Sequence, residues 1–141
     1  VIVSRHELHG NVADCMSRPA VVAHADDTVQ QVYSLILESG YSAFPVIEKK
    51  KLVGFISRRD LIAGGRVRTQ LTNASHAPVR DLMETTVVTI GPEDPISMAA
   101  DLLVRHDVSR LPVVEDGAVV GIIGRHDALG GLVDSPVRTG K

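Results

Sequence analysis

Two short segments of the chain place a glycine, an arginine and an aspartate at the same spacing. They are Gly54-Phe55-Ile56-Ser57-Arg58-Arg59-Asp60 and Gly121-Ile122-Ile123-Gly124-Arg125-His126-Asp127. Each segment ends an apolar run and opens a helical pattern. A strand-to-helix corner offers free backbone N–H groups and the positive end of the helix dipole, which suits a phosphate.

The charged side chains of these segments could extend that chemistry. Arg58 and Arg125 could form bidentate hydrogen bonds with an anion. Asp60 and Asp127, at the helix starts, could accept both hydroxyls of a ribose. An aspartate in this place is, however, commonly only a helix cap. The spacing alone leaves both interpretations open.

The elements that position these segments form a repeat of period 67. Residues 12–64 overlay residues 79–131 without a gap, and sixteen positions are identical. Internal repeats of this kind indicate one structural unit that occurs more than once. We therefore expect an N-terminal flank and a C-terminal tail around two repeats and a polar linker. The predicted boundaries are 1–11, 12–64, 65–78, 79–131 and 132–141.

Each repeat has the pattern βαββα. The first apolar runs are Val21-Val22 and 87–90. A helix with one buried face follows, because apolar residues recur at i, i+3, i+4, i+7 and i+8. The predicted buried positions are Val29, Val32, Tyr33, Ile36 and Leu37 in the first repeat, and Ile96, Ala99, Ala100, Leu103 and Val104 in the second.

Capping and turn residues bound these elements. Thr28 and Gln31 could form a capping box, Asp94 is predicted to be an N-cap with Pro95 at the first helical position, and Gly40 ends the first helix. Two apolar runs then form a hairpin. Its turn is 48–51 in the first repeat and Asp116-Gly117 in the second, which is a strong hairpin signal. A short helix is expected near Asp60 and near Asp127.

One repeat is too small to cover both faces of its own sheet. We therefore predict an α/β protein of the α+β type, in which the two βαββα repeats pack sheet to sheet with pseudo-twofold symmetry. This symmetry would create two equivalent clefts between the repeats.

Composition and charge exclude several classes of function. The net charge of −2 argues against broad nucleic-acid binding. The single cysteine, Cys15, allows no intramolecular disulfide and no cysteine-based zinc site. No apolar run is long enough for a membrane span and no signal peptide is visible, so we expect a cytoplasmic location and no membrane insertion. Because the chain begins at Val1, it could be a piece of a longer protein.

The histidines do not form a recognised metal motif. His6 and His9 are three residues apart and could share a metal, but Gly10 stands where a zinc motif of the H-E-x-x-H type needs its second histidine. We favour a solvated helix start and predict no metal site. Paired carboxylates, a nucleophile elbow and a phosphate-binding Walker loop are also missing from the sequence, so we predict that the chain is not an enzyme.

Both repeats resemble cystathionine-β-synthase-type (CBS) domains, and the tandem resembles a Bateman module. The resemblance rests on the two corner segments and on matching segments at the start and middle of each repeat. These are Asp14-Cys15-Met16 and Asp81-Leu82-Met83, with Tyr41-Ser42-Ala43-Phe44-Pro45-Val46 and Val108-Ser109-Arg110-Leu111-Pro112-Val113. Each motif is weak alone, whereas the full set, repeated in register over most of the chain, is specific.

The resemblance implies ligand-binding positions in both repeats. Asp60 and Asp127 would take the ribose hydroxyls, and Ser57 would assist, whereas Gly124 lacks the hydroxyl. The other implied positions near the base or phosphates are Tyr41, Ala43, Pro45, Pro19, Ala20 and Arg58 in the first repeat, and Val108, Arg110, Pro112, Thr86, Val87 and Arg125 in the second.

The function implied by the resemblance is regulatory. Such a module binds AMP, ADP, ATP or S-adenosylmethionine in the clefts and controls a fused or associated enzyme or transporter, assembles as a homodimer, and requires no cofactor. A structural dimerisation module with vestigial sites is the alternative, and Gly124 mildly favours it.

Overall fold

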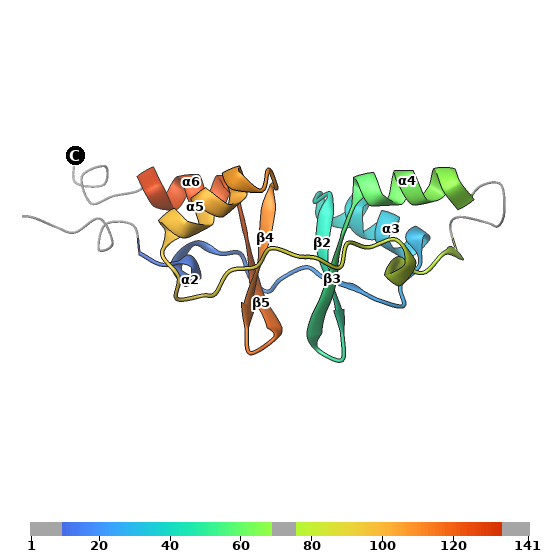
Figure 1. Cartoon of the computed structure of the whole chain (residues 1–141), viewed down its shortest axis with the longest axis horizontal. Coiled ribbons are helices and arrows are strands. Elements are labelled where there is room, and N and C mark those ends of the chain that lie inside the picture. Colours follow the sequence, from blue (N-terminus) through green and yellow to red (C-terminus); the bar gives the residue numbers. More distant parts are fainter. Residues whose placement is uncertain (1–9, 69–75, 134–141) are drawn as a thin grey trace, which may run out of the picture. The chain divides into compact units, whose positions relative to one another are not determined.

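The computed structural model describes residues 10–68 and 76–133 and shows a mixed α+β chain with two small sheets (Figure 1). The predicted His6–His9 pair lies outside these residues. The elements, in chain order, are α2 (Val12–Cys15), β1 (Ala23–His24), α3 (Val29–Ser39), β2 (Ala43–Glu48), β3 (Lys51–Ser57), α4 (Arg58–Arg68), the 3₁₀ turn η2 (Val79–Asp81), α5 (Ile96–Arg105), β4 (Arg110–Glu115), β5 (Ala118–Gly124) and α6 (Arg125–Val133).

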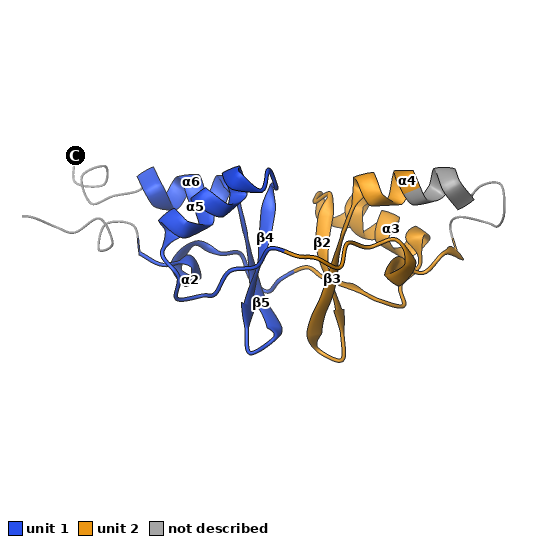
Figure 2. Ribbon diagram, in the orientation of Figure 1, with its two compact units in different colours: residues 1–20, 88–141 blue, residues 21–87 orange. Residues whose placement is uncertain are grey.

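The chain folds as two compact units, and their boundaries do not coincide with those of the sequence repeats (Figure 2). Unit 1 comprises residues 1–20 and 88–141, and unit 2 comprises residues 21–87. The leading segment of the first repeat, 12–20, therefore belongs with the body of the second. The leading segment of the second repeat, 79–87, belongs with the body of the first.

Backbone hydrogen bonds hold these two leading segments, 12–20 and 79–87, in the same register, and we call them the exchanged segments. In unit 1, the Val12 N–H donates to the Asp94 carbonyl at 2.8 Å, and Ser17 and Ile122 exchange two bonds at 2.8 and 3.1 Å. The equivalent bonds of unit 2, shifted by 67 residues, run from Val79 N–H to the Asp27 carbonyl at 2.7 Å, and between Phe55 and Glu84 at 2.9 and 2.8 Å. The exchange is thus the same in both units.

Both hairpins follow from the predicted apolar runs, whereas the first strand of unit 2 is Ala23–His24 and begins two residues after the start of the predicted run Val21-Val22. In unit 2 the strand order is β1-β2-β3, with β1 parallel and β3 antiparallel to β2. In unit 1, β4 and β5 form an antiparallel pair, and the first apolar run contributes an isolated parallel bridge between Ile90 and Val113. Both hairpins have a register shift at the same place, between Val46 and Ile47 and between Val113 and Val114.

Both hairpins close with two residues of positive φ, which matches the right-handed twist of the strands. Asp116 and Gly117 have φ of 54° and 83°, as the predicted Asp-Gly turn requires. Lys49 and Lys50 have φ of 52° and 69°. The first turn is therefore two residues long rather than the expected four.

Each unit has its own apolar core. Unit 2 buries Val32, Phe44, Val46 and Ile56 together with Val79 of the exchanged segment. Unit 1 buries Ala99, Leu103, Leu111 and Ile123 together with Val12 of its exchanged segment. The valine that opens each sequence repeat is thus fully buried in the unit built on the other repeat.

Three expectations for the helices are wrong in detail. The buried stripes are narrower than predicted, since Tyr33, Leu37 and Val104 are 56%, 66% and 79% exposed. The helix α5 begins at Ile96 with Pro95 as its N-cap residue, and the Asp94 carboxylate accepts the Gly91 N–H at 2.9 Å. The helix α4 continues to Arg68, into the segment predicted to be the linker.

Candidate functional site

The corner of unit 2 is a strand-to-helix junction closed by Ser57 and Asp60. Ser57 ends β3, and its hydroxyl accepts the Asp60 N–H at 3.2 Å. The Asp60 Oδ2 accepts the Ser57 N–H and the Ser57 hydroxyl, both at 3.0 Å. These reciprocal bonds form a capping box. The other carboxylate oxygen, Oδ1, has no hydrogen bond to the described residues.

The corner of unit 1 keeps the carboxylate but lacks the hydroxyl. The Asp127 Oδ2 accepts the Gly124 N–H at 2.9 Å, and Gly124 provides no side chain that could accept the Asp127 N–H. Within the described chain, the Asp127 Oδ1 also has no hydrogen-bond partner. Both aspartates are half-buried. Each therefore caps its helix through one oxygen and leaves the other available, so the two interpretations left open by the sequence are compatible.

The two arginines next to the corners occupy the same backbone position. The Arg58 N–H donates to the Ser42 carbonyl at 2.8 Å, and the Arg125 N–H donates to the Ser109 carbonyl at 3.1 Å. Their side chains differ, since the Arg125 guanidinium donates to the carbonyl of Val108 at 3.0 Å and to the Asp107 carboxylate at 3.2 Å. The Arg58 side chain has no hydrogen bond or ion pair to the described residues.

The strand residues predicted to line a base pocket lie directly beside the corners. Ala43 pairs with Ser57, and Arg110 pairs with Gly124. Tyr41 and Val108 lie in the loops that precede β2 and β4, where Tyr41 is 38% exposed. The prolines of the two strands, Pro45 and Pro112, are buried two pairs further along.

The remaining predicted residues are grouped by the exchange of leading segments. Pro19 and Ala20 belong to unit 1, with Gly124 and Asp127. Thr86 and Val87 belong to unit 2, together with the corner at Ser57 and Asp60. Each unit therefore contains a corner from one repeat and leading residues from the other, which the repeat pattern did not indicate.

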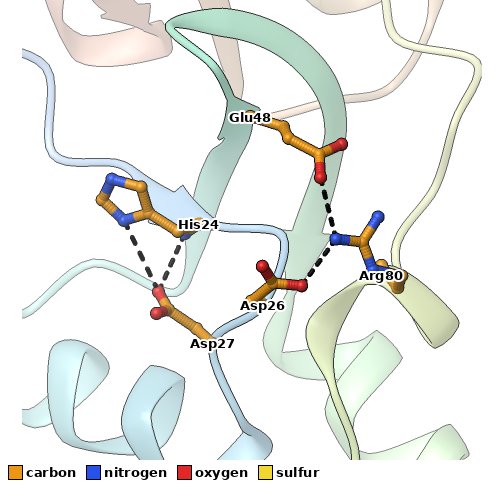
Figure 3. A network of polar contacts seen from close by, with 5 residues as sticks. All are labelled: His24, Asp26, Asp27, Glu48 and Arg80. Atoms are coloured by element: carbon orange, nitrogen blue, oxygen red, sulfur yellow. Dashed lines mark hydrogen bonds and ion pairs between the residues drawn. The ribbon is translucent and has the colours of Figure 1, made fainter.

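A charged cluster that the sequence did not reveal ties the exchanged segment to unit 2 (Figure 3). The Arg80 guanidinium donates to Glu48 at 2.9 Å and to Asp26 at 2.6 Å. The hydrogen bonds with Glu48 and Asp26 raise the pKa of Arg80 above its usual value, so it stays charged. Beside it, the Asp27 carboxylate accepts the His24 N–H at 2.8 Å. Glu48 and Asp26 lie 32 and 54 residues before Arg80 in the sequence, so no local pattern connects them to it.

Among residues 10–68 and 76–133, no group of three or more histidine, cysteine, aspartate or glutamate side chains could hold a metal ion. None of the helices in these ranges has the length and apolar character needed to cross a membrane.

Comparison with known proteins places both repeats in one family. The CBS domain family matches residues 12–64 and 79–134. A CBS domain-containing protein from Bacillus subtilis, YhcV, is 29% identical over 83% of this chain and 81% of its own length. An inosine-5′-monophosphate dehydrogenase from Korarchaeum cryptofilum is 31% identical over 78% of this chain, which spans only 22% of that enzyme.

Solved structures have the same fold. The structure of CBSX2 in complex with AMP has a TM-score of 0.76 and 26% identity, covering 93% of this chain and 98% of that one. The CBS domain pair of protein MJ0100, in complex with 5′-methylthioadenosine and S-adenosyl-L-methionine, has a TM-score of 0.71 and 25% identity, covering 83% and 90%. The sequence match and the shared fold together show that the chain belongs to the CBS domain family and carries two copies of the domain.

Proposed function

We propose that the chain is a regulatory module that binds adenosine-type ligands at its two corners. The observation that carries this proposal is the equivalent aspartate of each unit, Asp60 or Asp127, which is half-buried at a helix start. Its Oδ2 accepts a cap bond, and its Oδ1 has no hydrogen bond to the described residues. An open carboxylate oxygen beside backbone N–H groups can accept a ribose hydroxyl, and the adjacent arginine can bind a phosphate. The complexes of CBSX2 with AMP and of MJ0100 with S-adenosyl-L-methionine support this ligand class.

The remaining predicted positions would complete each site. We assign Tyr41, Ala43, Thr86 and Val87 to the unit 2 site with Ser57, Arg58 and Asp60. The unit 1 site would use Val108, Arg110, Pro19 and Ala20 with Gly124, Arg125 and Asp127, and the buried Pro45 and Pro112 would support the strands. The module would not be catalytic. Ligand binding would favour the conformation that binds it better, and a fused or associated effector would respond to this shift in population.

We also propose that the module forms a homodimer. The helices carry large apolar side chains that are exposed within the described chain. These are Tyr33 and Leu37 in α3, and Leu129 and Val133 in α6, with exposures of 56%, 66%, 59% and 48%. Analytical ultracentrifugation of the chain and of a Leu37→Asp, Leu129→Asp variant would test this. A wild-type chain that sediments as a monomer at high micromolar concentration contradicts the dimer.

Ligand binding is tested by calorimetry with AMP, ATP and S-adenosylmethionine. The informative variants are Asp60→Asn and Asp127→Asn, because an amide oxygen can still accept the cap bond while the NH₂ group replaces the open oxygen with a donor. A lost charge-assisted hydrogen bond should weaken binding at the altered site by about tenfold or more. Asp27→Asn is the matched control, since Asp27 makes the same i−3 contact with a backbone N–H, at 2.8 Å, away from the corner.

The outcome separates the regulatory function from a purely structural one. If no adenosine compound binds the wild-type chain at millimolar concentration, the sensing function is wrong and a structural dimerisation module remains. If binding occurs but Asp60→Asn and Asp127→Asn behave like Asp27→Asn, the ligand lies elsewhere.

A further inference from the structure

The two corner arginines are not equally available to an anion. In unit 1, the Arg125 guanidinium is bound on two sides, by the Val108 carbonyl at 3.0 Å and by the Asp107 carboxylate at 3.2 Å. Asp107 lies just after the end of α5, where its φ is 52°. Its side chain is 98% exposed, so the pair with Arg125 is a surface ion pair. An incoming anion must therefore compete with a carboxylate that already neutralises this arginine.

Unit 2 lacks this carboxylate at the equivalent position. Gly40 follows α3 where Asp107 follows α5, and it adopts the same left-handed conformation, with φ of 79°. The backbone at the corner is otherwise equivalent, because both arginine N–H groups donate to a serine carbonyl in the preceding loop. Arg58 is exposed, and its guanidinium has no ion pair with the part of the chain that the structure describes. The difference between the two arginines thus originates in one residue of the loop.

We propose that Asp107 is a specificity-determining residue that disfavours phosphate at the unit 1 corner, so that the two corners prefer different adenosine compounds. The unit 2 corner, with Arg58 and Gly40, would favour a nucleoside phosphate. At the unit 1 corner, Asp107 would offset the charge of Arg125, so this corner would favour an adenosine compound without phosphate. This inference rests on the proposed function, because it assumes that adenosine compounds bind at the corners.

The size of the effect follows from the exposure of the pair. Surface ion pairs are weak, so a phosphate that displaces Asp107 from Arg125 breaks only a small interaction. A phosphate that binds with Asp107 still in place is repelled by its like charge. We expect removal of the Asp107 charge to strengthen phosphate binding about threefold, in line with the usual strength of exposed pairs. Arg110, where unit 2 has Ala43, adds a cation to unit 1, so the two wild-type corners cannot be compared directly. The test must therefore change Asp107 itself.

The experiment measures AMP and adenosine in parallel by calorimetry on the full chain, because the two ligands differ only by the phosphate. Asp60→Asn first weakens the unit 2 corner, so that binding reports on unit 1. Adding Asp107→Asn should lower the Kd of AMP about threefold and leave that of adenosine unchanged. A third change, Arg125→Gln, should remove the gain. Asp101→Asn is the matched control, since it removes an exposed carboxylate that pairs with Arg105 at 2.7 Å in the same unit.

The converse variant introduces the carboxylate into unit 2. In an Asp127→Asn background, Gly40→Asp should raise the Kd of AMP about threefold without changing that of adenosine. The position tolerates a side chain in terms of space, because an added Cβ would meet nothing within 4 Å. Asparagine and aspartate also adopt positive φ more readily than most residues.

Two results would overturn the inference, and they are distinguishable. If adenosine and AMP bind but the ratio of their affinities does not respond to Asp107→Asn, or responds equally to Asp101→Asn, Asp107 does not set specificity. If neither ligand binds the wild-type chain, the proposed function itself is wrong and the inference is overturned together with it.

Discussion

Unit 1 and unit 2 share one backbone frame and differ in the side chains that close it. Their exchanged segments make the same hydrogen bonds, their hairpins have the same register shift, and the same kind of aspartate starts the last helix. They differ in three pairs of equivalent positions, each 67 residues apart. Ser57 corresponds to Gly124 at the corner, Lys50 to Gly117 at the hairpin tip, and Arg80 to Ala13 in the exchanged segment. The two units thus have the same backbone packing but different residues at the corner, the hairpin tip and the exchanged segment. Each difference can be tested by exchanging the equivalent residues.

The largest expected effect concerns a glycine that both units need. A Cβ on Gly54 would lie 2.5 Å from the Met83 Sδ and 2.8 Å from the Glu84 carbonyl, both in the exchanged segment. On Gly121 it would lie 2.5 Å from the Met16 Sδ but 3.1 Å from the Ser17 carbonyl. Overpacking against backbone is costly, so we expect Gly54→Ala to lower the free energy of unfolding by about 2–3 kcal/mol and Gly121→Ala by less.

Urea denaturation followed by circular dichroism measures both glycine variants. Gly130→Ala is the control for an added methyl group that meets nothing within 4 Å. Because Gly130 lies inside α6, this change should raise the free energy of unfolding by about 0.5–1 kcal/mol. A Gly54→Ala variant as stable as the wild-type chain would show that the exchanged segment is not packed against Gly54 as described.

The next effect concerns the capping box at the corner. Ser57→Ala removes the acceptor of the Asp60 N–H and should lower the free energy of unfolding by about 1 kcal/mol. Gly124→Ser should raise it by about 0.5–1 kcal/mol, by restoring that acceptor and by restricting the unfolded chain. The added Cβ would meet Ser109, Arg110 and Asp127 only at ordinary contact distances, between 3.4 and 3.7 Å. Thermal unfolding would measure both changes. A destabilised Gly124→Ser variant would mean that the two corners are not interchangeable.

A somewhat smaller effect concerns the hairpin tips. Lys50 adopts a φ of 69°, which is unfavourable for a residue with a Cβ, whereas Gly117 adopts 83° at little cost. We expect Lys50→Gly to raise the free energy of unfolding by about 0.5 kcal/mol, because a type I′ turn favours glycine there. Lys50→Ala removes the same charge without the conformational relief and should give no gain in the same urea experiment.

The smallest effect concerns the ion pairs of Arg80. Exposed ion pairs contribute little, so Arg80→Ala should leave global stability almost unchanged and speed local amide exchange in the exchanged segment. Hydrogen–deuterium exchange measures this effect at the backbone amide of residue 80, which donates to the Ala25 carbonyl at 3.1 Å. Alanine keeps this amide, so the same probe is present in the wild-type chain and in the variant. High salt should produce a similar increase in the wild-type chain by screening.

The reverse exchange tests the same ion pairs in unit 1. There Glu93 and Glu115 stand where unit 2 has Asp26 and Glu48, so Ala13→Arg should slow exchange of the Ala13 amide, which donates to Pro92 at 2.8 Å. If Arg80→Ala and Ala13→Arg both leave exchange unaltered at low salt, the ion pairs do not stabilise the segments.

Much of the frame was predictable because it depends on local patterns. The hairpin at Asp116-Gly117, the capping box of Thr28 and Gln31, and the helix end at Gly40 all follow from residues within four positions of one another. The capping role of Asp60 was likewise predictable, because an aspartate at a helix start is commonly a cap, whereas its role in ligand binding stays a prediction. The helix stripes were less reliable, because periodicity alone gave no measure of how much neighbouring apolar surface would cover Tyr33 or Leu37.

Local sequence patterns are enough to predict two copies of one frame, each with an aspartate at the start of its last helix. Only the folded chain reveals which copy each leading segment packs against, with Val12 in the core of unit 1 and Val79 in the core of unit 2. The physical reason is that the two copies have nearly the same apolar pattern, so a leading segment fits either acceptor and local sequence cannot distinguish them. Likewise, only the fold brought Asp107 to Arg125 and Arg80 to Asp26, because these charges are distant along the chain and meet only after the strands have paired.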